Sequence, residues 1–96
     1  MPSYRVTMIV GPLEMGVRPE DVLPTLTQAI ADYTTVEASD IAISAGAPRV
    51  TVRFTADDDR AAFLIAEQGI DGTRVSMDPI AWQVTRQVKG RWEPLP

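Results

Sequence analysis

The chain has 96 residues, of which 45% are hydrophobic and 23% charged, and it contains neither cysteine nor histidine. This length and composition are typical of one globular domain with a single hydrophobic core. The absence of cysteine excludes disulfides and thiolate metal sites, and the usual proton-transfer and nucleophilic side chains are scarce. We therefore expect one domain over residues 1–96, no cofactor, no metal, and a binding role in preference to catalysis.

The net charge of −4 at pH 7 disfavours nonspecific binding to nucleic acid phosphates. The longest uncharged apolar run covers residues 8–13, far fewer than the roughly 20 residues that cross a bilayer. The first residues, MPSYR, lack the charged and apolar regions of a signal peptide. We expect a soluble cytoplasmic protein without membrane contact or a nucleic acid partner.

The first third of the chain predicts a strand, a long loop and a helix. Residues 4–10 alternate with the period of a strand, and Ile9 adds an apolar residue on the second face, as in a central strand. Residues 11–21 contain two glycines and two prolines and predict a loop. Because proline fits only the first turn of a helix, Pro24 predicts a helix from about Asp21, as N-cap, to about Tyr33. Its apolar stripe comprises Val22, Leu23, Leu26, Ile30 and Tyr33.

Residues 36–45 and 49–56 predict a β-hairpin, with Gly46, Ala47 and Pro48 as its turn. The second strand has the cleanest alternation in the chain. Apolar residues at one register alternate with arginine and threonine at the other, which is typical of an antiparallel sheet covered on one side. The inward set is Val50, Val52, Phe54 and Ala56, and the outward set is Arg49, Thr51, Arg53 and Thr55.

Asp57, Asp58 and Asp59 precede a second predicted helix that ends at Gly69. Its predicted buried stripe is Ala62, Phe63 and Ala66. Three adjacent carboxylates raise the hypothesis of a metal site. The run lacks the spacing, glycine and distal glutamate of a calcium loop, so capping of the helix is favoured.

The last quarter predicts a turn at Asp71-Gly72, a short strand at residues 74–77 that is interrupted by Asp78-Pro79, and a long strand over residues 80–88. Residues 91–96 predict a C-terminal tail. The long strand is predicted to turn one set of side chains toward the core, namely Ile80, Trp82, Val84 and Val88.

The order of elements predicts an α+β fold with the ferredoxin-like βαββαβ arrangement. This is a two-layer sandwich in which two helices cover one face of a four-stranded antiparallel sheet. The arrangement hosts many unrelated functions and does not identify one.

The open sheet face is the first candidate surface. If the apolar registers face the helices, the other side is polar and basic. Four interpretations remain open: a solvated face, sheet-to-sheet self-association, a small anionic ligand held by forked arginine contacts, or single-stranded RNA. RNA is the least favoured because the outward positions lack the aromatic residues on which bases stack. The residues expected on this side are Arg5, Thr7, Arg49, Thr51, Arg53, Thr55, Gln83 and Thr85. The candidate site residues among them are Arg5, Thr7, Arg49, Thr51, Arg53 and Thr85.

The predicted loop over residues 11–21 is the second candidate surface. Leu13, Met15 and Val17 either fold back onto the core or contact a partner. Trp92 is expected to pack the tail onto the domain or onto a neighbouring subunit.

The leading hypothesis is a non-enzymatic interaction module that acts by protein–protein contact, in particular as a homodimer. The second is a regulatory or binding domain for a small anionic ligand on the open sheet face. The third is a small cofactor-independent enzyme.

Overall fold

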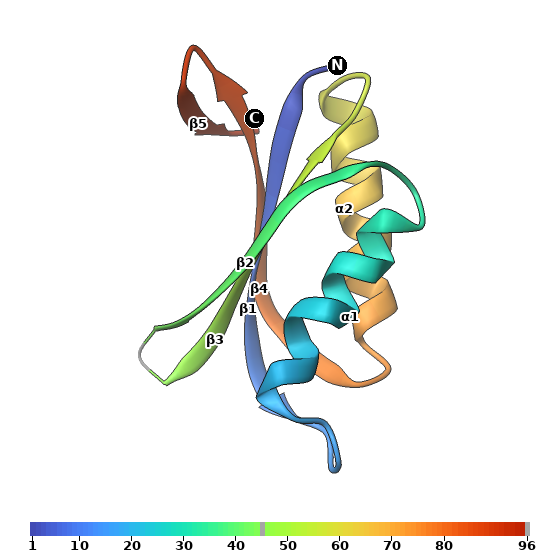
Figure 1. Cartoon of the computed structure of the whole chain (residues 1–96), viewed down its shortest axis with the longest axis vertical. Coiled ribbons are helices and arrows are strands. Elements are labelled where there is room, and N and C mark those ends of the chain that lie inside the picture. Colours follow the sequence, from blue (N-terminus) through green and yellow to red (C-terminus); the bar gives the residue numbers. More distant parts are fainter. Residues whose placement is uncertain (45, 96) are drawn as a thin grey trace.

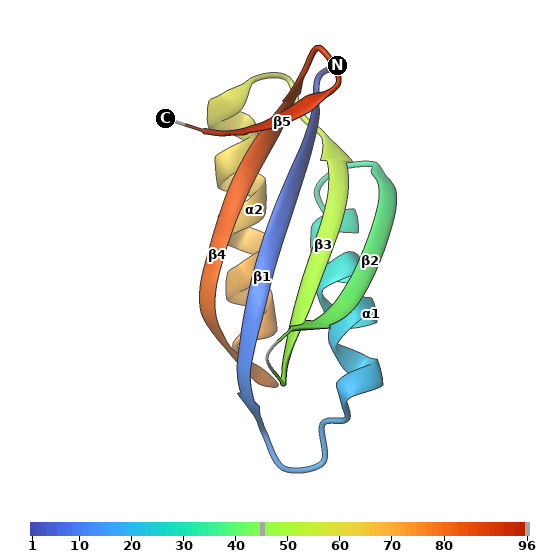
Figure 2. The same ribbon diagram turned by 90° about the vertical axis from the view of Figure 1, so that its left-hand side faces the viewer.

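The computed structural model describes residues 1–44 and 46–95, which form two helices packed on a five-stranded antiparallel sheet (Figure 1). Both helices cover the same face of the sheet, whose strand order is β2-β3-β1-β4-β5 (Figure 2). In the described residues, no helix is long and apolar enough to cross a membrane. The elements are β1 (Ser3–Leu13), α1 (Pro19–Ala31), β2 (Val36–Ser44), β3 (Ala47–Thr55), α2 (Asp59–Thr73), β4 (Met77–Val88) and β5 (Arg91–Pro94).

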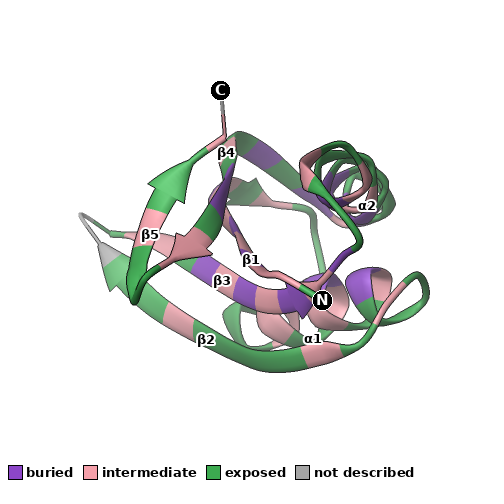
Figure 3. Cartoon of the chain, turned by 90° about the horizontal axis from the view of Figure 1, so that it is seen from above, coloured by how far each residue is buried: buried purple, intermediate pink, exposed green. Residues whose placement is uncertain are grey.

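The core lies between the helices and the covered face of the sheet. Every second residue of β1 and β3 is buried, and the residues between them are exposed or half-buried (Figure 3). This confirms the predicted registers of these two strands. The buried residues include Tyr4, Val6, Met8, Val10, Val50, Val52 and Phe54 from the sheet, with Val22, Leu26, Ile30, Ala62, Ala66 and Ile70 from the helices.

The start of α1 differs from the prediction. β1 continues to Leu13 and α1 begins at Pro19, so the predicted loop shortens to residues 14–18. Asp21 is the third helical residue, not the N-cap; its carboxylate accepts the backbone N–H of Arg18 at 3.1 Å, which lowers the pKa of Asp21. Pro24 therefore lies inside the helix. Tyr33 lies beyond the last helical residue and is exposed.

The start of α2 confirms the capping interpretation. The Asp58 carboxylate accepts the backbone N–H of Ala61 at 2.8 Å. Asp59 instead accepts hydrogen bonds from the Tyr4 hydroxyl at 2.8 Å and from Arg86 at 3.3 Å, which joins α2 to β1 and β4. In the part of the chain that the structure describes, no group of three or more acidic side chains is placed to hold a metal.

The predicted end of α2 at Gly69 is wrong, because the helix continues through Gly69 and the predicted Asp71-Gly72 turn to Thr73. Gly69 is buried against α1, where a Cβ would overlap the Ile30 side chain. The glycine thus permits close helix packing. The placement of Phe63 in the buried stripe is also wrong, since this side chain is 45% exposed.

β4 begins at Met77, so the short strand predicted at residues 74–77 does not form. The strand passes through Pro79, where the pairing with β1 shifts register. An irregularity of this kind accommodates a proline that has no N–H to donate. Val84 is buried as predicted, whereas Ile80 is 60% exposed and was wrongly assigned to the core.

The predicted tail forms a fifth strand. β5 pairs with residues 85–88 of β4 through a turn at Lys89-Gly90, whose φ values of 50° and 81° are both positive. Two central residues with positive φ match the twist of a tight hairpin. The sheet consequently has five strands rather than four, and Pro96 lies outside the described residues.

The turn between β2 and β3 is tighter than predicted. Ala47 and Pro48 pair with Ser44 and Ile43, and Gly46 adopts a φ of 82°. Ala45, assigned to the end of the preceding strand, lies outside the described residues.

Candidate functional site

The six candidate face residues lie on the open face of the sheet, where Arg5 on β1 is opposite Arg53 on β3 and Arg49 is opposite Ile9. Cross-strand pairing orders this face into three rows that run across the sheet. The first row is Ala42, Arg49, Ile9 and Ala81; the second is Asp40, Thr51, Thr7 and Gln83; the third is Ala38, Arg53, Arg5 and Thr85.

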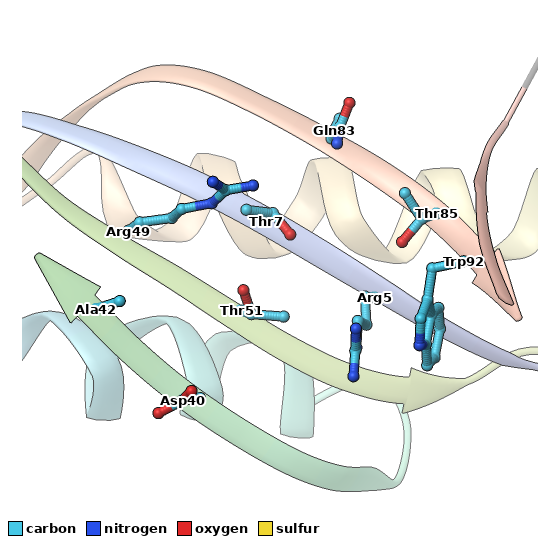
Figure 4. Close-up of a pocket in the computed structure, with 9 residues that line it drawn as sticks. All are labelled: Arg5, Thr7, Asp40, Ala42, Arg49, Thr51, Gln83, Thr85 and Trp92. Atoms are coloured by element: carbon cyan, nitrogen blue, oxygen red, sulfur yellow. The ribbon is translucent and has the colours of Figure 1, made fainter. Parts of the chain in front are cut away.

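The sheet curls away from the helices, so that β2 and β5 stand at the two sides of the open face (Figure 3). A hollow of about 470 Å³ lies between them, and all five strands contribute to its lining. Figure 4 shows that the lining side chains stand on the side of the sheet away from the helices. They are Arg5, Thr7, Asp40, Ala42, Arg49, Thr51, Gln83, Thr85 and Trp92.

Trp92 forms one end of this hollow because the β5 hairpin carries it back over the sheet. The Arg5 guanidinium carbon lies 4.1 Å from the centre of the indole ring, and that of Arg53 lies 5.4 Å away. Such cation–π contacts stabilise a guanidinium and restrict its orientation. Trp92 thus packs onto its own domain and fixes Arg5 in the hollow.

Arg53 has a different role from the other two arginines of this face. Its Nε lies 3.3 Å from the Glu37 carboxylate, and its Nη2 donates to the Gln87 side chain at 3.2 Å. The Ser3 hydroxyl donates to the same Glu37 oxygen at 2.7 Å. The charge of Arg53 is therefore neutralised by Glu37, in a network that links β1, β2, β3 and β4. Arg53 is not among the residues that line the hollow.

Arg49 is exposed, and no carboxylate within the described residues lies at ion-pair distance from it. Its side chain extends across β1 so that the guanidinium lies over Thr7 (Figure 4). The charged residues of the hollow are Arg5, Arg49 and Asp40, which give it one net positive charge. The hydroxyls of Thr7 and Thr51 and the amide of Gln83 add neutral hydrogen-bonding groups. Fixed guanidinium groups beside such donors suit a carboxylate or a phosphate.

A second hollow of about 250 Å³ adjoins the first. The two share Thr7, Arg49 and Gln83, and the second adds the apolar residues Ile9, Ala81 and Trp82 to its lining. The sequence prediction did not select Ile9, Ala81, Asp40 or Ala42 as site residues. The period of two that selected Thr7 and Thr85 also points to Ile9 and Ala81, so the signal for these two positions was present.

The second predicted surface does not form as a unit. Leu13 belongs to β1 and packs against the core, Val17 is half-buried, and Met15 is fully exposed. The three residues therefore do not present one continuous apolar patch.

Among the described residues that line the hollow, Asp40 carries the one carboxylate. The clearest pKa shift is that of Tyr4, on the covered face, where burial and the hydrogen bond to Asp59 raise the pKa to about 12. This chemistry supports binding better than proton transfer. Comparison with known protein families, with characterised proteins and with solved structures found no match to this chain.

Proposed function

We propose that this protein is a small binding module that holds an anionic ligand on its open sheet face. The observation that carries the proposal is the placement of Arg49, an arginine without a described carboxylate partner, at the junction of two hollows. A guanidinium binds a carboxylate or phosphate through two parallel hydrogen bonds. The hydroxyls of Thr7 and Thr51 stand beside it as further donors.

The topology supports this choice of surface. The order β2-β3-β1-β4, with both helices on one face, fits a ferredoxin-like βαββαβ core to which β5 is added. In this arrangement the helices seal one face and leave the other for contacts. The curl of the sheet makes the open face concave, which favours a ligand that enters the hollow over a flat partner surface.

Isothermal titration calorimetry at low ionic strength tests the proposal with phosphate, sulfate and acetate as probes. We expect Arg49→Gln to weaken binding about tenfold or more, because charge-assisted hydrogen bonds contribute roughly 1.5–3 kcal/mol. Arg60→Gln is the matched control, since Arg60 is exposed on α2 and the change in net charge is identical. Equal affinities for both variants, or no binding by the native chain, would contradict the proposal.

Self-association is the second candidate function, and a separate surface favours it. Apolar side chains gather where α2 meets β4, and the rings of the exposed Phe63 and the half-buried Trp82 lie 5.5 Å apart. Ile80 and Leu64 are exposed on the same two elements, and β5 pairs only with residues 85–88 of β4. A contiguous apolar patch beside an uncovered strand edge is suited to contact with a second copy.

Light scattering over a range of concentrations tests this candidate. The native chain is expected to form a dimer that Phe63→Asp converts to a monomer. Tyr33→Asp, at an exposed aromatic residue just after α1, is the control and should leave the dimer intact. A native chain that stays monomeric at the highest concentration would contradict self-association.

A further inference from the structure

We infer that the ligand is an elongated amphipathic acid, with one carboxylate or phosphate head at Arg49 and an apolar body on Ile9 and Ala81. The inference rests on the proposed function and specifies the class of ligand. Its basis is that one row of the open face changes from a cation to apolar side chains within three adjacent strands.

The arrangement of the two hollows sets the position of the head. Both hollows are lined by Arg49, Thr7 and Gln83, so an acid group held there has open space on either side. The guanidinium of Arg49 lies over Thr7, at this shared boundary (Figure 4).

The composition of the two hollows sets the direction of the body. On one side lie Arg5, covered by Trp92, and the Asp40 carboxylate, which would repel a second acid group. On the other side lie Ile9, which is half-buried, and Ala81, which is exposed. The second side offers apolar side chains without a carboxylate beside them, so the apolar body of a ligand loses contact with water there.

Ala81 determines how much room the body has. Its small side chain lies opposite Ile9 in the cross-strand pairing, and next along β1 the pairing with β4 shifts register. A large side chain at this exposed position would fill the second hollow without entering the core. Ala81→Phe therefore separates the binding of the body from the binding of the head.

The experiment measures the affinity of the full chain for straight-chain carboxylates and alkyl phosphates of increasing length, all short enough to remain monomeric. For the native chain we expect up to about fourfold tighter binding per added methylene, the value for complete burial, until the second hollow is filled. Ala81→Phe should abolish the dependence on chain length and leave the affinities for acetate and inorganic phosphate unchanged. Ala31→Phe, at an exposed position in α1, is the control and should behave as the native chain.

The two series distinguish the two head groups, since the better-fitting head group binds more tightly at every chain length. Short anions that bind with no effect of chain length would overturn this inference and leave the proposed function standing. A length dependence that persists in Ala81→Phe would overturn the placement of the body. Failure of every anion to bind would overturn both.

Discussion

The two faces of β1 and β3 are formed by alternate residues of the same strands, yet they differ in burial and in charge. On the covered face Tyr4 and Phe54 are fully buried and stack with their ring centres 6.1 Å apart. On the open face Arg5 and Thr51 are half-buried around a hollow. Folding depends on the covered face, whereas the proposed ligand binding depends on the open face, so substitutions should affect either stability or binding.

The largest difference in the free energy of unfolding is expected between Phe54→Ala and Thr51→Ala. Phe54 is completely buried, and its truncation should lower the free energy of unfolding by about 3–5 kcal/mol, because transfer and cavity terms add. Thr51→Ala should change it by about 1 kcal/mol or less, the range of strand preferences. Urea denaturation measures both. Similar values for the two variants would show that the open face also stabilises the fold.

Substitution of two glycines in α2 tests how closely α2 packs against α1. Gly69→Ala should destabilise the fold by about 1–3 kcal/mol, since the added methyl overlaps Ile30. Gly72→Ala should be neutral or stabilising by up to about 1 kcal/mol, because its Cβ would lie 3.5 Å from the Ala29 Cβ and alanine favours helix. If α1 and α2 pack as described, Gly69→Ala should lower the melting temperature, whereas Gly72→Ala should leave it unchanged or raise it.

The alkaline stability of the fold depends on Tyr4. Burial and the hydrogen bond to Asp59 raise its pKa from 10.0 to about 12. Below pH 10 the hydroxyl is protonated in both states. Between pH 10 and 12 the unfolded chain ionises while the folded chain does not, so the free energy of unfolding should fall as pH rises.

Tyr4→Phe should remove this part of the pH dependence and lower stability by about 1 kcal/mol at neutral pH through the lost hydrogen bond. Tyr33→Phe is the control, since Tyr33 is exposed. Parallel stability curves for native chain and Tyr4→Phe from pH 9 to 12 would refute the role given to Tyr4.

The smallest expected effect is a gain in affinity. Asp40→Asn removes the one carboxylate of the hollow and should strengthen anion binding about two- to fivefold, as expected for a solvated charge pair. Asp40→Asn should change the free energy of unfolding by no more than about 0.5 kcal/mol. Glu67→Gln on α2 makes the same change in net charge outside the hollow. If both variants gain the same affinity for anions, the effect arises from net charge and not from the removal of a carboxylate in the hollow.

Local periodicity accounts for most of what could be predicted. The period of two in β1, β3 and β4 identified the six face residues, and that of β1 and β3 identified the core of the sheet, because each strand's alternation fixes which side chains share a face. The first turn of α2 was also predictable, since an aspartate cap needs only its own neighbours. The site residues Ile9 and Ala81 were missed because apolar residues on a polar face carry no chemical signal of their own.

The errors concern features that depend on distant parts of the chain. Gly69 resembles a helix stop in sequence, and only the approach of Ile30 explains it as a packing residue. β5 is short and ends in proline, so its strand conformation depends on pairing with β4. The contact of Trp92 with Arg5 depends on that pairing in turn.

The central claim is that the open face, and not the helical face, binds an anion. Titration of the ¹⁵N-labelled chain with inorganic phosphate, followed by amide chemical shifts, tests it most directly. The account predicts that the largest shifts occur at Thr7, Arg49, Thr51 and Gln83, and that α1 and α2 stay unchanged. Shifts that cluster around Phe63 and Leu64 on α2, or no shifts at any residue, would contradict it.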